Sequence, residues 1–224
     1  MIILGITGSV ATGKTFVADF FKREGLDGFY ADDVCHKLIQ QNLRVIELIS
    51  RFFPGVEAQG IIDKHKLAQI VFHDNQQLDR LEEILHPYIE NEMLWFIEQS
   101  GRSEGGICFV EVPLLFESGW HKYCTYTLVT HCDATLQKQR ALDRPGMDTQ
   151  KFSAILARQM PDDQKKQRAN FVVDTGKGDT HTLEQLEGVF SVLAEKYKEL
   201  TLEAERLEAE KEKERRQKRR QAKQ

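Results

Sequence analysis

The sequence lacks the features that would mark a secreted, membrane-spanning or metal-centred protein. Its four cysteines, Cys35, Cys108, Cys124 and Cys132, form no CxxC pair and no Cys/His metal spacing, so we expect free thiols in a reducing compartment. No apolar run reaches the length of a transmembrane helix. The short apolar start Met1–Gly5 has no basic segment before it and no cleavage site after it, unlike a signal peptide. We therefore expect a cytoplasmic protein with no membrane partner.

An excess of charge of one sign is also absent. The 224 residues carry 31 Lys and Arg against 35 Asp and Glu, a formal net charge of −4. That balance gives no general attraction to nucleic acid or to an anionic membrane. The length instead predicts one domain with insertions, large enough to bury a sizeable core.

What is present is an alternation of short apolar segments and helical stretches. Such alternation predicts an α/β fold with a parallel sheet that is covered on both faces. A first helix is expected over Phe16–Lys22. The five expected strands are Ile2–Thr7, Phe29–Ala31, Ile107–Val112, Tyr126–Thr130 and Phe171–Asp174, with a Gly-rich turn before the third.

Two long segments interrupt the alternation. Residues 34–100 look mostly helical, with breaks expected near Pro54-Gly55, Gly60 and Pro87. Residues 133–170 are polar and contain several Lys and Arg, which suits a mobile helical flap better than a core layer.

The C-terminal region predicts a long helix. Thr182 and Gln185 fit a capping box at its start. From Leu183 to Leu207, apolar residues recur at spacings of three and four, as in a heptad seam, and we expect the first half to pack on the sheet. From Glu203 onward there are six acidic and nine basic residues. This tail is interpreted as a solvated helix, with a coiled-coil contact to a second chain as the alternative; RNA contact by the basic end Arg215–Lys223 is only weakly indicated.

The residues Gly8-Ser-Val-Ala-Thr-Gly13-Lys14-Thr15 match the phosphate-binding pattern G-x-x-x-x-G-K-[ST] in full, between an expected strand and an expected helix. Glycines let the backbone turn so that successive N–H groups face an anion. Lys14 would neutralise the β- and γ-phosphates, Thr15 would ligate Mg²⁺, and Phe16 would offer its backbone N–H to an inner phosphate. The pattern predicts nucleotide binding.

Other residues narrow the chemistry. No N-K-x-D guanine signature follows, which argues against a GTPase. Asp32 lies at the carboxyl end of the second expected strand, on the sheet edge where ligands bind, and could accept a hydroxyl proton during phosphoryl transfer. Glu111, at the end of the third strand, could hold a metal-bound water. Arg140, Arg144 and Arg158 lie in the flap, where positive charge would stabilise a transferring phosphoryl group.

These segments, taken in order over about residues 1–200, resemble bacterial dephospho-coenzyme A kinase. The shared segments after the phosphate loop are Ala31-Asp32, Leu85-His86-Pro87-Tyr88-Ile89, Pro113-Leu114-Leu115-Phe116-Glu117, Gln139-Arg140 with Arg144, Gln159-Met160-Pro161 and Ala169–Asp174. The chain departs from the family at three positions. Tyr30 replaces an Asp, His36 an Arg, and Thr175 an Asn.

The resemblance implies a three-layer P-loop NTPase fold with a five-stranded parallel sheet. The core would be residues 1–31 and 105–200, with a helical substrate-binding insertion over 32–104, a flexible lid over about 138–170, and a charged helical tail over 201–224. The implied reaction is transfer of the γ-phosphate of ATP to the ribose 3′-hydroxyl of dephospho-coenzyme A, the last step of coenzyme A synthesis.

The resemblance also implies roles for single residues. Asp32 would be the base, with Lys14 and Arg140 stabilising the transferring group. ATP would be bound by Gly8, Ala11, Thr12, Gly13, Lys14, Thr15, Phe16 and Arg144, and Mg²⁺ by Thr15 and Glu111. The acceptor would contact Asp32, His36, His86, Leu115 and Glu117.

Two alternatives stay open at this point. One is another small-molecule kinase on the same scaffold, for a nucleoside or a sugar. The other is a non-catalytic nucleotide sensor that docks partners through its heptad tail. We expect a monomer, with self-association through the tail as the alternative.

Overall fold

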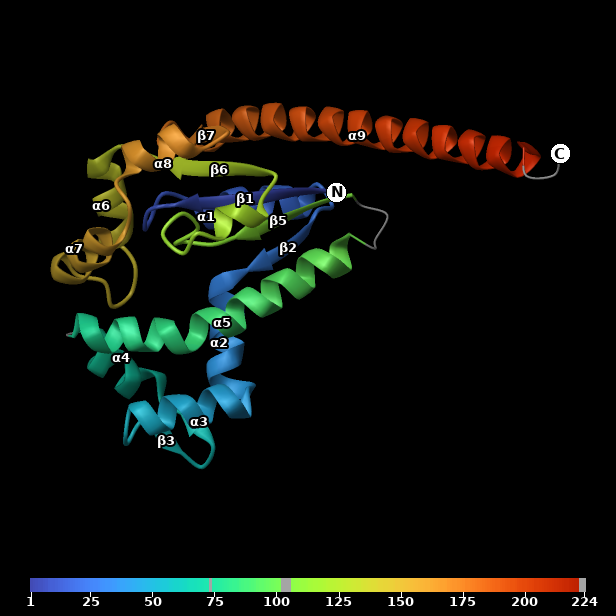
Figure 1. The fold of residues 1–224 in the computed structure, drawn as a ribbon. Coiled ribbons are helices and arrows are strands. Elements are labelled where there is room, and N and C mark those ends of the chain that lie inside the picture. Colours follow the sequence, from blue (N-terminus) through green and yellow to red (C-terminus); the bar gives the residue numbers. More distant parts are fainter. Residues whose placement is uncertain (73, 102–105, 222–224) are drawn as a thin grey trace.

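A five-stranded sheet forms the centre of the computed structural model, which describes residues 1–72, 74–101 and 106–221, with side chains described as far as Glu212 (Figure 1). All of its strand pairs are parallel, in the order β2-β5-β1-β6-β7. The five-stranded parallel sheet expected from the sequence is therefore confirmed. Its strands are β1 (Ile2–Gly8), β2 (Asp27–Tyr30), β5 (Ile107–Glu111), β6 (Tyr126–His131) and β7 (Phe171–Asp174).

Helices bury both faces of this sheet. On one face, α1 (Lys14–Arg23) and the first part of α9 (Asp179–Gln221) pack against a cluster that includes Leu4 and Ile6, both fully buried. On the other face, α5 (Asn75–Ser100) and the 3-10 helix η1 (Trp120–Tyr123) contribute to a second cluster with Val110. Strands covered in this way need apolar side chains on both sides, which explains their continuous apolar sequences.

The insertion between β2 and β5 consists of helices and one short hairpin, below the sheet in Figure 1. The expected breaks near Pro54-Gly55 and Gly60 are present and contain this hairpin. Gln59 and Gly60, with φ of 56° and 79°, form its two-residue loop, since such loops need positive φ at both central residues. The elements are α2 (Ala31–Gln41), α3 (Leu43–Phe52), β3 (Glu57–Ala58), β4 (Ile61–Ile62), α4 (Lys64–Phe72) and α5.

The break expected at Pro87 is wrong. Helix α5 runs without interruption over 26 residues with Pro87 inside it. Proline removes one backbone hydrogen bond from a helix, but α5 packs against α2, α3, α4 and the sheet. Buried side chains flank the proline on both sides, among them Leu85, Ile89 and Met93. Tertiary packing therefore outweighs the local cost.

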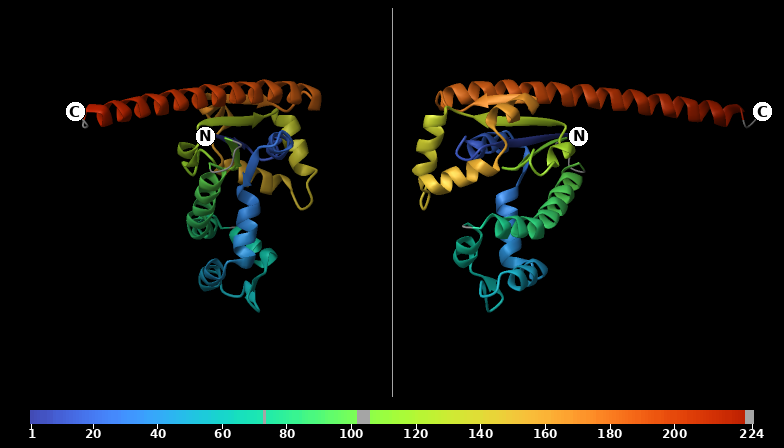
Figure 2. Two further views of the ribbon diagram at one scale, coloured as in Figure 1. Left: turned by 90° about the vertical axis from the view of Figure 1, so that its right-hand side faces the viewer. Right: turned by 60° about the vertical axis from the view of Figure 1, so that its left-hand side comes forward.

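Three short helices, α6 (Ala134–Leu142), α7 (Thr149–Arg158) and α8 (Asp162–Arg168), connect β6 to β7. They form one side of the molecule next to the phosphate-binding end of the sheet (Figures 1 and 2). Below, this segment is called the lid. Its residues are mostly polar, and Phe152 is its largest buried apolar side chain.

Helix α9 lies along the sheet and then extends past the rest of the molecule (Figure 2). As expected, its first half packs on the core, where Leu186 and Leu193 are fully buried, whereas Leu200 and Leu207 are 44% and 49% exposed. The expected capping box is wrong because the helix begins at Asp179. The basic end of the tail and the Gly-rich turn before β5 lie outside the described side chains and residues.

Candidate active site

The loop between β1 and α1 has the backbone of a phosphate-binding loop. Gly8 has φ of 153°, and a Cβ there would meet the side chain and backbone of Thr130. Ala11 and Gly13 have φ of 63° and 88°, and non-glycine residues with such angles gather at functional sites. Gly13 is the N-cap residue of α1, and no side chain accepts a hydrogen bond from the first N–H groups of that helix. These N–H groups can therefore bind an anion.

A cavity of about 470 Å³ opens above this loop, at the carboxyl ends of β1, β2 and β5. Ligands bind at this edge in open α/β sheets. Charges of both signs line the cavity, which suits a nucleotide phosphate together with a cation. The lining residues are Ala11, Gly13, Lys14, Thr15, Asp19, Lys22, Tyr30, Asp32, Asp33, Glu111 and Arg144.

Lys14 is held at the base of this cavity. Its Nζ donates to the backbone carbonyls of Gly8 at 3.0 Å and Ser9 at 3.2 Å. Burial lowers the pKa of Lys14 to about 8, although the charges of Glu111 and Asp32 favour the ammonium form. Burial also raises the pKa of Glu111, an effect that Lys14 opposes. A phosphate would supply the negative charge that this lysine needs.

Asp32 stands where three cavities meet. It lies in the first turn of α2, since β2 ends at Tyr30 and Ala31 already belongs to the helix. Besides the cavity above the loop, it lines one of about 290 Å³ shared with the lid and one of about 180 Å³ against α5. A carboxylate at this junction can reach a phosphate on one side and an acceptor on the other.

The smaller cavity has mostly apolar walls. His86 lines it and lies edge-on to Trp120, with ring centroids 5.5 Å apart. Pro113 and Leu114 line both this cavity and the one shared with the lid. Of the other residues predicted to contact the acceptor, Leu115 is fully buried in the core, and His36 is exposed on α2.

The three lid arginines lie in different places. Arg144 lines the cavity above the loop and the neighbouring one. Arg140 instead donates to the hydroxyl of Thr175 at 3.1 Å and to its carbonyl at 2.9 Å. Arg158 forms ion pairs with Asp79 and Glu82 of the insertion, so it joins the lid to α5.

Two loop residues predicted to bind the nucleotide also hold the loop in shape. The hydroxyl of Thr12 is buried; it donates to Ser9 O at 2.8 Å and lies 2.8 Å from the hydroxyl of Thr130. The ring of Phe16 packs against the core cluster beneath α1. The backbone N–H of Thr12 donates to Ser9 O at 3.3 Å, whereas the N–H of Phe16 lies in the first turn of α1, where helix N–H groups lack intrahelical partners.

The cavity also contains donors suited to Mg²⁺, although no group of three or more His, Cys, Asp or Glu side chains forms a metal site within the described residues. The Thr15 hydroxyl and the Glu111 carboxylate both line it. Mg²⁺ prefers oxygen ligands and is usually bound through one or two carboxylates together with substrate phosphates. These residues therefore fit that ion.

The sequence did not predict how tightly the lid contacts the phosphate loop. Val10 N–H donates to the side-chain oxygen of Gln159 at 2.9 Å, and its carbonyl accepts from Gln137 at 2.8 Å. The hydroxyl of Ser9 donates to Asp162. These partners are more than 120 residues away along the chain, so no local pattern could have indicated them.

Comparison with known proteins identifies the relatives of this chain. A family model described as dephospho-CoA kinase matches residues 2–180. Dephospho-CoA kinase of Bartonella quintana is 39% identical over 86% of this chain and 97% of that protein. The enzyme of Agrobacterium fabrum is 37% identical over 86% of this chain and 98% of its own length.

Solved structures agree with the fold. TT1252 from Thermus thermophilus superposes with a TM-score of 0.70 and 32% identity, over 87% of this chain and 97% of its own. Dephospho-CoA kinase from Campylobacter jejuni gives a TM-score of 0.65 at 23% identity, over 86% and 97%. None of the helices in the described part of this chain combines the length and apolar character needed to cross a membrane. The P-loop kinase fold expected from the sequence is confirmed, and the chain belongs to the dephospho-coenzyme A kinase family.

Proposed function

We propose that the cavity above Lys14 binds the phosphates of ATP and that Asp32 activates the hydroxyl of an acceptor bound on its other side. As a member of its family, the chain is a kinase that phosphorylates dephospho-coenzyme A with ATP, the final step of coenzyme A synthesis. This assignment of the ATP side and the acceptor side rests on the position of Asp32 at the junction of the three cavities.

The proposed step is a direct transfer. The 3′-hydroxyl oxygen of the acceptor ribose attacks the γ-phosphorus, the bond from that phosphorus to the bridging oxygen of ADP breaks, and the hydroxyl proton passes to the Asp32 carboxylate. Lys14 and the amides at the start of α1 offset the negative charge of the β- and γ-phosphates. The cavity against α5, with His86 in its wall, holds the adenosine part of the acceptor.

Thr15 and Glu111 are the residues that would hold Mg²⁺, Glu111 through a metal-bound water. When bound, the ion would neutralise part of the charge that develops on the phosphates. Arg144 extends from the lid to the cavity and would stabilise the transferring group. Arg140 is kept as a second candidate that would have to leave Thr175 first.

The expected division of the chain is part of the proposal. The insertion over 32–104 would bind the acceptor, and the lid over about 138–170 would close on the nucleotide. His36 and Glu117 remain proposed contacts of the acceptor, although neither residue lines the three cavities at Asp32. The four cysteines are free thiols, and the proposed location is the cytoplasm, where disulfides are rare.

The test is the reaction itself. Purified protein with ATP and Mg²⁺ should release ADP when dephospho-coenzyme A is added and form coenzyme A in equal amount. Adenosine, AMP and a sugar serve as control acceptors and should give no product. ADP release with a control acceptor, and none with dephospho-coenzyme A, would overturn the proposal in favour of another small-molecule kinase.

A further inference from the structure

A lysine of the lid is completely buried beside the phosphate-binding loop. Lys165 in α8 is 0% exposed, and its Nζ lies 3.0 Å from Oε1 of Glu117, in the turn after β5. The same oxygen accepts the backbone N–H of Met160 at 2.7 Å. Lysine is rarely buried unless it is paired, so this ion pair fixes α8 against the turn.

The residues just before Lys165 contact the loop directly. Gln159 accepts from the backbone N–H of Val10 at 2.9 Å, and Asp162 accepts from the hydroxyl of Ser9. One short segment, 159–165, therefore touches the phosphate-binding loop at one end and the turn after β5 at the other. Below, it is called the clasp.

The contact at Ser9 leads to the cation of the site. The carbonyl of Ser9 accepts from Lys14 Nζ at 3.2 Å and from the Thr12 hydroxyl at 2.8 Å. The clasp therefore contacts Ser9, whose carbonyl accepts a hydrogen bond from Lys14. A shift of Ser9 would move that ammonium group, and misplacement by about 1 Å in a site of this kind is costly.

The composition of the clasp argues for a role in positioning. A buried ion pair is weak evidence for stability, because the loss of hydration offsets much of the attraction between the charges. Within the described structure, Glu117 Oε2 and Lys165 Nζ are both buried without a hydrogen-bond partner, although Nζ lies at ion-pair distance from Oε1, so this pair is not optimised for stability alone. Two charges placed there do fix one geometry of the lid relative to the loop.

We propose that Lys165 and Glu117 are positioning residues which hold the clasp against the phosphate-binding loop, and that the loop needs them to bind ATP in the right geometry. The inference rests on the proposed function only in that the loop binds nucleotide phosphates. It gives Glu117 a role in placing the loop, in addition to its predicted place near the acceptor.

The experiment measures nucleotide binding and thermal stability separately, on the full chain. Lys165→Met should weaken the affinity for ATP with Mg²⁺ about tenfold, by analogy with other small displacements in active sites. Lys166→Met is the matched control, since Lys166 is the next residue and forms an ion pair at 2.7 Å with the exposed Asp163 of the same helix. The control should keep the affinity within about twofold, as surface pairs contribute little.

A second variant separates positioning from stability. In Lys165→Met, the Glu117 carboxylate loses its cation, so the melting temperature should fall. Adding Glu117→Gln removes that unpaired charge and should restore the melting temperature, while the affinity for ATP should stay low. Because the clasp acts through Ser9, Asp162→Asn should weaken ATP binding less in the Lys165→Met background than in the parent.

Wild-type affinity in a folded Lys165→Met protein would overturn the inference. So would recovery of affinity and melting temperature together in the double variant, because that result would assign the pair to stability alone. If Lys165→Met does not fold, the double variant is measured in its place. A low affinity for ATP then supports the inference, and wild-type affinity overturns it. A parent protein that binds ATP but does not phosphorylate dephospho-coenzyme A would refute the proposed function and leave this binding test intact.

Discussion

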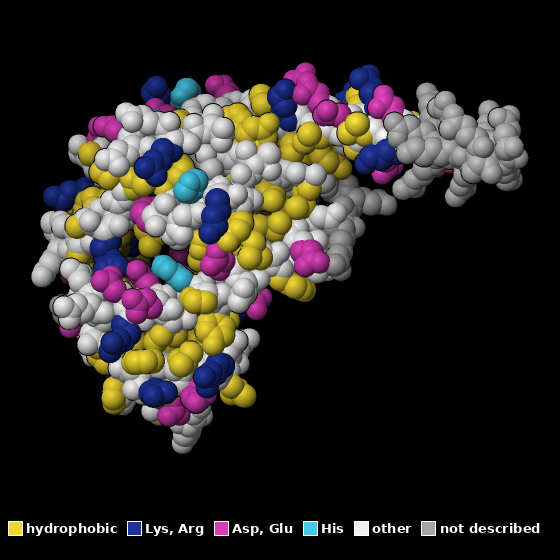
Figure 3. Space-filling view, viewed as in Figure 1, with side chains coloured by type: hydrophobic (Ala, Val, Ile, Leu, Met, Phe, Trp, Pro, Cys, Tyr) yellow, Lys and Arg dark blue, Asp and Glu magenta, His cyan; other side chains and the backbone are white. Residues whose placement is uncertain are grey.

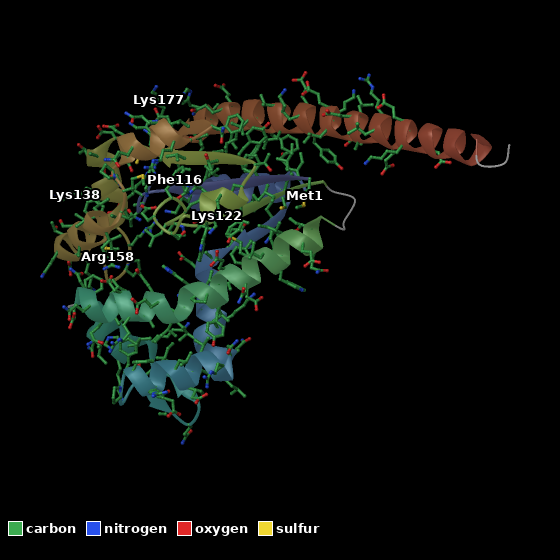
Figure 4. All side chains as sticks on the ribbon, viewed as in Figure 1. Met1, Phe116, Lys122, Lys138, Arg158 and Lys177 are labelled. Atoms are coloured by element: carbon green, nitrogen blue, oxygen red, sulfur yellow. The ribbon has the colours of Figure 1, made fainter. Side chains whose placement is uncertain are left out.

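The guanidinium group of Arg158, at the end of α7, lies 2.7 Å from a carboxylate oxygen of Asp79 and 2.8 Å from one of Glu82. Arg158 extends from the lid toward α5 (Figure 4), and the side chains of both Arg158 and Glu82 are less than a third exposed. Charged side chains of both signs lie scattered among hydrophobic and other side chains on the face of the molecule seen in Figure 3. This contact joins the lid to the insertion over the cavity that Arg158, Glu82 and Asp32 share.

Removing this arginine should loosen the lid. We expect Arg158→Ala to lower the free energy of unfolding by about 1 kcal/mol, which shifts the melting temperature by about 2–4 °C in a chain of this size. The KM for dephospho-coenzyme A should rise, because Arg158 holds Glu82, which lines the proposed acceptor cavity. Arg168→Ala, at an exposed position of α8, is the control and should change neither quantity. Equal effects of the two variants would contradict the assigned role.

Asp32→Asn tests the proposed base. Asparagine keeps the size of the side chain but cannot take the hydroxyl proton, so kcat should fall by about 10²–10⁴-fold. The affinity for ATP should stay nearly unchanged, because Lys14 and the loop amides are intact. Asp27→Asn, an exposed position at the start of β2, provides the matched control. Near-normal turnover of the Asp32 variant would remove this residue from the role of base.

The lowered pKa of Lys14 predicts that ATP binding depends on pH. In the free protein the ammonium form is lost as the pH rises through about 8, and the neutral amine binds phosphate poorly. Bound phosphate favours the ammonium form and raises its pKa. Binding above pH 8 should therefore take up a proton, and the affinity should fall as the pH increases from 8 to 9.5.

Titration calorimetry in buffers with different ionisation enthalpies would measure this proton uptake. Lys14→Arg is the control, because a guanidinium stays charged throughout this range. Its affinity should be lower than that of the parent at neutral pH, but it should not change between pH 8 and 9.5. An affinity of the parent that is equally flat would contradict the loss of a proton by Lys14 in this range, and an equal fall in both proteins would assign the pH dependence to another group.

The end of α9 should be dispensable for catalysis. Leu200, Leu202 and Leu207 are all more than 40% exposed, so a chain that stops after Leu200 loses little buried surface. We expect its kcat and KM to stay within about twofold of the parent, as for other surface changes. By contrast, Leu193→Ala, at a fully buried position of the same helix, should cost about 2–5 kcal/mol of stability. Loss of activity in the truncated chain would instead favour a functional tail.

Much of the fold could be predicted because its signals are local. The strands of the sheet are continuous apolar runs, and the phosphate-binding loop is a contiguous motif between a strand and a helix. The failures at Pro87 and at Thr182 have a different origin. In the structure Thr182 lies inside α9, and the Gln185 side chain bonds to both backbone groups of Asp174, at the end of β7. Tertiary contacts determined both outcomes.

The candidate site divides in the same way. Lys14 and Thr15 could be predicted from the phosphate-binding motif and Glu111 from the end of its strand, and the structure places all three on one cavity together with Asp32. Which arginine of the lid reaches that cavity depends on how α6 packs. The resemblance implied Arg140 for the transferring group, whereas the structure places Arg144 on the cavity and bonds Arg140 to Thr175. Lys165 gave no signal at all, because it stands among other charged residues of α8 and only the folded chain shows that it is buried.

The meeting of three cavities at Asp32 has a consequence for inhibitor design. In the proposed arrangement, donor and acceptor approach one carboxylate from opposite sides, so a single molecule could occupy both positions if a polyphosphate bridge replaced the transferring group. Binding of the first half then presents the second at an effective concentration in the millimolar range for a short linker. The length of the bridge that binds best would measure the separation of the two substrates in solution.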